Sequence, residues 1–103
     1  MTKLVLDKDF ARLHAHGKYF KGKNFRFLYL KNELGAFRFA VAISRKIGNA
    51  VTRNRIRRRL TETIKKCKTE NLGVDMVIFP YITAKTTKFC LLVQEFASAI
   101  ESL

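Results

Sequence analysis

Acidic residues are scarce in this chain of 103 residues, where 8 Asp and Glu stand against 21 Lys and Arg and give a formal net charge of +13. The eight acids are scattered, so the sequence offers no carboxylate cluster to hold catalytic metal ions. His14 and His16 are two positions apart and would diverge on a helix, which argues against a metal site or an acid–base pair. We therefore expect no catalytic residue and no metal ligand in the protein itself.

Cysteine and long apolar runs are equally sparse. Cys67 and Cys90 lie in apolar stretches without CxxC spacing, which fits packing roles in a reducing compartment better than a disulfide framework. No run approaches the roughly 18 apolar residues of a membrane span, and the chain reaches Asp7 before any long apolar run, so no signal peptide is predicted. Linkers, repeats and low-complexity segments are also missing. We expect one cytoplasmic domain over residues 1–103, with no membrane partner.

Apolar and aromatic residues, by contrast, are abundant: 48% of the chain is hydrophobic and nine residues are Phe, which excludes disorder. Periodicity and turn residues predict six elements, namely a helix from Asp7 or Asp9 to Gly17, strands at 25–30 and 37–44, a helix from about 50 to 68, a strand at 74–81 and a helix at 85–103. Residues 18–23 are interpreted as a basic connector, and the first two strands as an antiparallel hairpin. The order α-β-β-α-β-α indicates an α+β two-layer sandwich, one sheet with helices packed on it.

The positive charge is concentrated in residues 45–68, which contain ten bases and one acid, Glu62. Residues 69–103 carry a net charge of −2, and five arginines fall within the seven positions 53–59. A solvated helix face usually mixes signs, because pairs of opposite charge at i,i+4 stabilise it. A block of one sign costs stability unless a polyanion relieves it, so we predict a nucleic-acid-binding surface here.

Local signals indicate how this basic segment is presented. Asn49 is a good N-cap for the helix that follows. A narrow apolar stripe would face the core and leave most of the arginines on the exposed flanks, with Arg53 near its edge. The stripe consists of Ile56, Leu60, Ile64 and Cys67.

RNA is favoured over DNA as the partner. A major-groove recognition helix usually follows another helix and a tight turn, whereas this helix follows a strand. In the strand at 37–44, large apolar residues alternate with small or polar ones, so one face would be covered by helices and the other would leave room for a ligand. Aromatic residues on a sheet beside a basic patch suit single-stranded RNA, whose bases can stack.

The run Ser44-Arg45-Lys46-Ile47-Gly48-Asn49-Ala50-Val51-Thr52-Arg53-Asn54-Arg55-Ile56-Arg57-Arg58 closely resembles the signature of the bacterial ribonuclease P protein component. It contains the Arg-Asn-Arg motif, preceded by a Lys-x-Gly-Asn-Ala-Val segment. Asp9-Phe10 near the start, Gly17 before the first strand and the order of elements extend the resemblance over most of the chain.

The resemblance implies a protein subunit of the ribonucleoprotein that removes the 5′ leader from precursor tRNA. Its partners would be the catalytic ribonuclease P RNA and precursor tRNA, and no DNA. Catalysis would belong to the RNA subunit and its bound magnesium ions, so no cofactor of the protein itself is expected. The family fold also joins two parallel strands through the basic helix by a left-handed crossover, contrary to the general rule.

Matching positions imply an RNA-contacting set of Lys46, Asn49, Arg53, Asn54, Arg55, Arg57 and Arg58. Arg45 and Arg59 extend this set because they belong to the same basic patch. For the leader cleft on the open face of the sheet, Phe10 matches a family aromatic, and His14 and Tyr29 are added as neighbouring candidates. The chain departs from the family pattern at His14, where an apolar or aromatic residue is common, at Thr61, where a base is usual, and at Arg59, where Leu is usual.

A small structural or ribosomal-type RNA-binding protein remains the alternative, because it would share the charge and the sheet. The two roles differ in substrate: a structural module should bind precursor and mature tRNA equally in the presence of ribonuclease P RNA.

Overall fold

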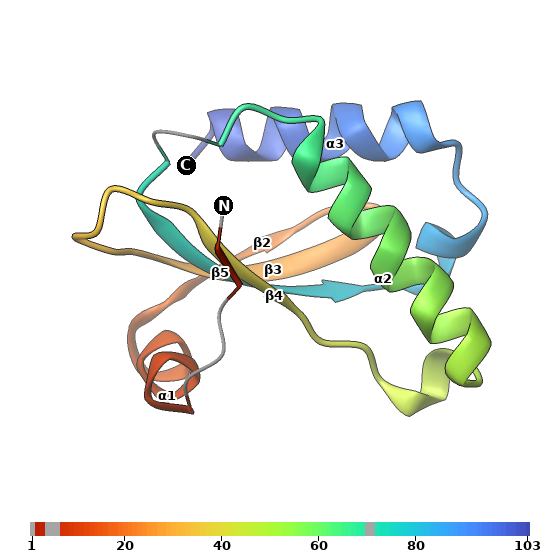
Figure 1. The fold of residues 1–103 in the computed structure, drawn as a ribbon, viewed down its shortest axis with the longest axis horizontal. Coiled ribbons are helices and arrows are strands. Elements are labelled where there is room, and N and C mark those ends of the chain that lie inside the picture. The colour runs from red at the N-terminus through yellow and green to blue at the C-terminus, as the bar shows by residue number, and fades with distance from the viewer. Residues whose placement is uncertain (1, 4–6, 70–71) are drawn as a thin grey trace.

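The computed structural model describes residues 2–3, 7–69 and 72–103 of the chain. In chain order the strands and helices are β1 (Thr2–Lys3), α1 (Asp7–His16), β2 (Lys18–Lys21), β3 (Phe25–Lys31), β4 (Arg38–Val41), the 3-10 helix η1 (Arg45–Ile47), α2 (Ala50–Lys65), β5 (Val74–Pro80), the 3-10 helix η2 (Ile82–Lys85) and α3 (Phe89–Glu101). The α2 and α3 helices cover one face of a single sheet, and α1 lies against the other (Figure 1). The predicted α+β arrangement of one sheet with helices packed on it is confirmed.

The strand order is β1-β4-β5-β3-β2, which places β5 near the middle of the sheet. It pairs antiparallel with β3 on one side and parallel with β4 on the other. The predicted hairpin between the strands at 25–30 and 37–44 is therefore wrong, because β5 lies between them. Six of the seven β5 residues are buried, so this strand takes an interior position where both of its faces are covered.

The partner of β3 in a hairpin is β2, so the prediction of a basic connector at residues 18–23 is wrong for residues 18–21. Three of the four β2 residues, including both lysines, are exposed. Lysine-bearing, solvated strands are typical of sheet edges, because charge there discourages pairing with another chain.

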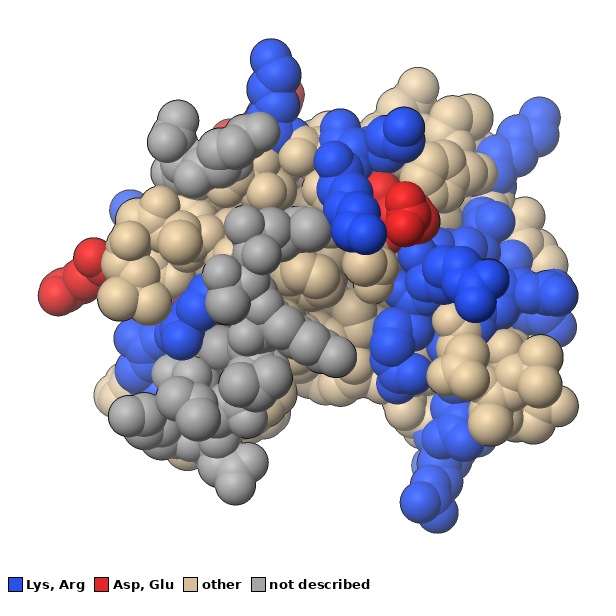
Figure 2. Space-filling model, in the orientation of Figure 1, with Lys and Arg blue, Asp and Glu red and all other residues tan. Residues whose placement is uncertain are grey.

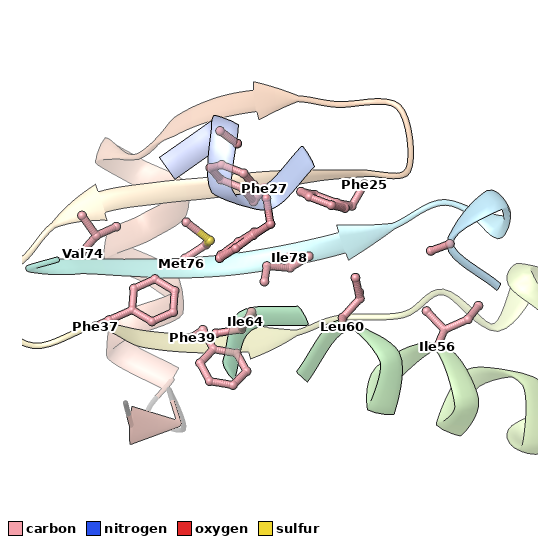
Figure 3. Packing of buried hydrophobic residues seen from close by; sticks show 13 residues of the cluster. Phe25, Phe27, Phe37, Phe39, Ile56, Leu60, Ile64, Val74, Met76 and Ile78 are labelled. Atoms are coloured by element: carbon pink, nitrogen blue, oxygen red, sulfur yellow. The ribbon is translucent and has the colours of Figure 1, made fainter. Parts of the chain in front are cut away.

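The α2 helix connects the parallel strands β4 and β5. Figure 3 views the sheet from the side of α2 and α3; with the strands turned to point upward, β5 lies to the left of β4. The β4–α2–β5 crossover is therefore left-handed, as the family resemblance implied and against the right-handed preference of parallel connections.

The main core lies between the sheet and the two helices α2 and α3 (Figure 3). Five fully or nearly buried phenylalanines supply much of its volume, and α2 contributes three aliphatic side chains. These residues are Phe25, Phe27, Phe37, Phe39, Phe96, Ile56, Leu60 and Ile64. The alternation predicted for residues 37–44 is confirmed, since Phe37 and Phe39 are buried here while Ala40 and Ala42 face the other side.

A smaller cluster lies on the opposite face, where Leu13 of α1 packs on Leu28 of β3 and Val77 of β5. We call this side of the sheet the open face. The α1 helix covers only part of it, and Ala42 and Phe79 remain half-buried. Gly17 ends α1 as predicted, and a Cβ there would lie 2.4 Å from the Leu13 carbonyl oxygen, so a side chain would disrupt the turn into β2.

The ends of β4 and α2 and the start of α3 differ from the predicted boundaries of these elements. The strand at 37–44 ends at Val41, because Ser44 begins η1. The α2 helix ends at Lys65 rather than near residue 68, and the last helix begins at Phe89 rather than at residue 85, because η2 occupies residues 82–85.

Candidate nucleic-acid interface

Two successive side-chain caps hold the segment that leads into α2. The Ser44 Oγ accepts a hydrogen bond from the Lys46 backbone N–H at 3.2 Å and so starts η1. The Asn49 Oδ1 accepts a hydrogen bond from the Thr52 backbone N–H at 2.9 Å, which confirms the predicted N-cap of α2. The caps leave other N–H groups of the first helical turn unpaired, and the partial positive charge of the helix end adds to that of the arginines.

The apolar stripe of α2 fixes which way its arginines point. Ile56, Leu60 and Ile64 are at most 2% exposed and face the main core, as predicted. Cys67 lies beyond the helix end and is half-buried, with its Sγ 3.8 Å from the Val93 carbonyl oxygen. Because the stripe is narrow, positions on either side of it remain in solvent.

The cationic side chains of η1 and of the first half of α2 therefore form one continuous patch, which we call the basic surface (Figure 2). It consists of Arg45, Lys46, Arg53, Arg55, Arg57 and Arg58. All of these except Arg53 are exposed. The Asn54 Oδ1 accepts a hydrogen bond from Arg57 Nη1 at 3.1 Å, which orients that guanidinium along the helix.

The single acid of this region, Glu62, does not neutralise the basic surface. Its Oε1 lies 3.6 Å from Lys65 Nζ, one turn further toward the C-terminus of α2. The arginines at the start of the helix are thus left as a cluster of one sign, with planar groups that donate in a fork to phosphate oxygens.

Arg53 and Arg59 differ from the other arginines of α2. Arg53 is half-buried, and its Nε is a buried donor without a hydrogen-bond partner within the described ranges. The Arg59 guanidinium donates from Nε to the Ala84 carbonyl oxygen at 3.1 Å and from Nη2 to the Thr87 carbonyl oxygen. Arg59 thereby ties α2 to the segment around η2, and its RNA contact stays a prediction.

The three residues predicted for the leader cleft are not brought together. Phe10 is half-buried beside Leu13 on the open face, and His14 is exposed on the same helix. Tyr29, however, packs against the main core on the other side of the sheet. Placing Tyr29 in that cleft was therefore wrong: side chains alternate along β3, and it is Leu28 that faces α1.

A groove of about 600 Å³ opens at the end of the open face nearest to η1. Its lining includes Arg26, Ala42 and Phe79 from the sheet, Ser44, Lys46 and Ile47 from the η1 segment, and residues 80–82. Lys46 belongs both to this groove and to the basic surface. A single-stranded RNA segment in the groove could thus continue directly onto the basic surface.

At the opposite end of the open face, Asp75 of β5 is completely buried and binds three side chains from other elements. Arg38 donates from Nε to Oδ1 at 2.8 Å and from Nη2 to Oδ2 at 2.6 Å, and Arg12 donates from Nη2 to Oδ2 at 2.5 Å. Asn32 donates from Nδ2 to Oδ1 at 2.7 Å. This Asp75 network anchors α1, through Arg12, to the sheet.

The network also sets the ionisation of its acid. Burial by itself raises the pKa of Asp75, but the hydrogen bonds from Arg38 and Asn32 and the positive charges of Arg38 and Arg12 outweigh it. The pKa of this carboxyl is therefore held below its ordinary value.

Neither cysteine is paired. Burial raises the pKa of the Cys67 thiol, which makes it a poor nucleophile. Cys90 is exposed on α3, so the packing role predicted for it is wrong.

In the part of the chain that the structure describes, no three His, Cys, Asp or Glu side chains gather in a way that could hold a metal ion. No helix among the same residues has the length and apolar character to cross a bilayer.

Sequence reasoning overlooked Arg26 and Asp75, both on the open face. Asp75 is the one charged residue of β5, and Arg26 is the one charged residue of β3 apart from Lys31 at its end. A charge in such a position needs a partner or a ligand, so this signal was available in the sequence.

Solved structures share this backbone. The ribonuclease P protein from Thermotoga maritima matches with a TM-score of 0.84 at 22% identity, over 100% of this chain and 98% of that one. The ribonuclease P protein of Staphylococcus aureus matches with a TM-score of 0.82 at 25% identity, over 99% and 94%. The fold is thus that of the bacterial ribonuclease P proteins.

The sequence comparisons agree with the fold. The Ribonuclease P family model matches residues 2–103. A relative from Carboxydothermus hydrogenoformans, named ribonuclease P protein component, is 34% identical over 101 residues, which span 95% of this chain and 87% of that relative. This chain belongs to the ribonuclease P protein component family, whose name implies a holoenzyme that includes an RNA subunit.

Proposed function

We propose that this chain is the protein subunit of ribonuclease P and promotes removal of the 5′ leader from precursor tRNA. In this proposal the basic surface binds the catalytic RNA, and the open face holds the leader. Magnesium ions bound to the RNA supply the chemistry of phosphodiester cleavage, and the protein contributes binding and orientation.

One observation carries the proposal: Lys46 lies in both the basic surface and the groove of the open face. The basic surface offers forked donors and helix N–H groups, which bind phosphates without regard to sequence. The groove offers apolar and aromatic walls, against which unpaired bases can stack. A single protein can therefore hold a folded RNA and an adjoining single strand together.

The test is reconstitution of leader removal. The chain is mixed with a bacterial ribonuclease P RNA and a 5′-labelled precursor tRNA at a magnesium concentration too low for the RNA alone. We expect cleavage at the mature 5′ end when both subunits are present, and none from the protein alone. Cleavage without added RNA, or no gain over RNA alone with any such RNA, would overturn the proposal.

A binding measurement separates this role from that of a structural RNA-binding protein. The protein–RNA complex should bind precursor tRNA more tightly than mature tRNA, because the leader gains contacts on the open face. Equal affinity for the two substrates would favour the structural role instead.

A further inference from the structure

Arg26 is held against aromatic rings on the open face. It lies on β3 directly opposite Phe79 of β5. Its guanidinium carbon is 4.6 Å from the centroid of the Phe79 ring and 5.5 Å from that of the Tyr19 ring. A guanidinium over a ring face gains cation–π attraction and loses much of its freedom of movement. The side chain is thus fixed in place before any ligand arrives.

In the part of the chain that the structure describes, the donors of Arg26 are left unused. Its side chain forms no hydrogen bond or ion pair with residues 2–3, 7–69 or 72–103. Three of the four other half-buried arginines are engaged by the protein: Arg12 and Arg38 bind Asp75, and Arg59 binds two carbonyl oxygens. Arg26 therefore offers a positioned fork of N–H donors to whatever occupies the groove.

The groove around Arg26 favours a base over a phosphate. Much of its lining is apolar or aromatic, including Ala42, Ile47 and Phe79. A phosphate among such side chains would lose hydration without replacement, whereas the flat faces of a base fit against them. Lys46 is exposed beside the groove, where it can reach the phosphate next to a bound base.

We propose that Arg26, stacked on Phe79, selects a guanine in the leader of precursor tRNA; this inference rests on the proposed function. Guanine presents two acceptors, O6 and N7, at the spacing of the arginine fork. The adenine edge replaces one of these acceptors with an amino donor, which an arginine cannot accept from. The leader would then carry one position at which guanine is preferred.

The experiment measures affinities of reconstituted holoenzyme for precursor tRNAs in which each leader position carries each of the four bases. Wild-type holoenzyme should bind guanine at one position about 5- to 150-fold more tightly than the other bases. The Arg26→Gln variant should reduce this preference below about twofold and leave the affinity for mature tRNA unchanged. Lys21→Gln is the matched control. Lys21 is exposed and pairs with Arg26 in the sheet, and its replacement by Gln removes the same charge. It should keep the preference.

Three results would overturn the inference: no guanine preference in the wild type, an equal preference in Arg26→Gln, or a uniform loss of affinity with a smaller salt dependence. The last would identify a phosphate contact.

If Arg26→Gln does not fold, Phe79→Leu removes the stacking ring instead and should also weaken the preference for guanine. Restored cleavage at low magnesium tests the proposed function separately. A wild type that restores cleavage without a guanine preference would therefore reject this inference alone.

Discussion

At the scale of single residues, Asp75 shows how a buried charge is retained. Its carboxylate is completely buried and accepts hydrogen bonds from two arginines and one asparagine. We expect Asp75→Asn to lower the free energy of unfolding by about 3 to 5 kcal/mol, because it leaves the two arginines without their counter-charge. Urea denaturation at pH 7 measures this loss. Glu62→Gln, which breaks only the exposed pair with Lys65, should cost at most about 1 kcal/mol. Similar losses in the two variants would contradict the prediction.

The lowered pKa of Asp75 also predicts how stability depends on pH. A carboxyl whose folded pKa lies below its unfolded value, about 3.9, stabilises the fold fully above that value and progressively less as pH falls through the folded pKa. The difference in unfolding free energy between wild type and Asp75→Asn should therefore be constant from about pH 7 to pH 5 and shrink below about pH 4. Denaturation curves across this range measure it. A difference that already shrinks near pH 6, or never shrinks, would show that another group is responsible.

Single residues also show where sequence reasoning succeeded and where it failed. The Asn49 cap and the burial of Ile56, Leu60 and Ile64 were predicted because each depends on neighbours within one or two helical turns. The face of Tyr29 could have been predicted as well, since alternation along 25–30 places it with Phe27. The stacking of Arg26 on Phe79 could not, because it required knowing that β3 pairs with β5.

At the scale of elements, α2 was predicted closely and the sheet was not. The helix has its own cap and apolar stripe, so its identity is encoded locally. The strand order depends on which strand is buried best, and this is a comparison among segments far apart in the chain, such as β3 at 25–31 and β5 at 74–80. Residues 18–21 carry too little apolar surface to predict a strand, and they form one because β3 offers a free edge.

The basic surface of α2 yields a prediction about salt. Arg55→Ala and Arg58→Ala should each weaken binding of ribonuclease P RNA and reduce the slope of log K against log salt by about one, if each contacts a phosphate. Binding titrations at several salt concentrations measure the slope. Lys66→Ala is the matched control, because it removes one exposed charge at the other end of the same helix. An equal change in the control would show that net charge matters and position does not.

At the scale of the whole molecule, the two proposed RNA-binding regions meet at Lys46, but residues far from that junction should affect only one of them. Phe10 belongs to α1 on the open face, away from the main core beneath α2. We expect Phe10→Ala to spare assembly with the catalytic RNA and to weaken precursor binding by about 5- to 150-fold, the usual effect of losing one stacked base. Affinities of the assembled complex for precursor and mature tRNA measure this. An equal loss for both substrates, or failure to assemble, would contradict the separation.

The central position of β5 has a consequence for how the protein is made. β5 is the shared neighbour of β3 and β4, and its Met76 and Ile78 complete the core beneath α2. During translation, the arginines of α2 leave the ribosome before residues 74–80 do. Until then β3 can pair only with β2, and the helix has no finished sheet to pack on. A nascent chain therefore displays its positive charge on an unfinished scaffold, and the native basic surface forms only after β5 has emerged.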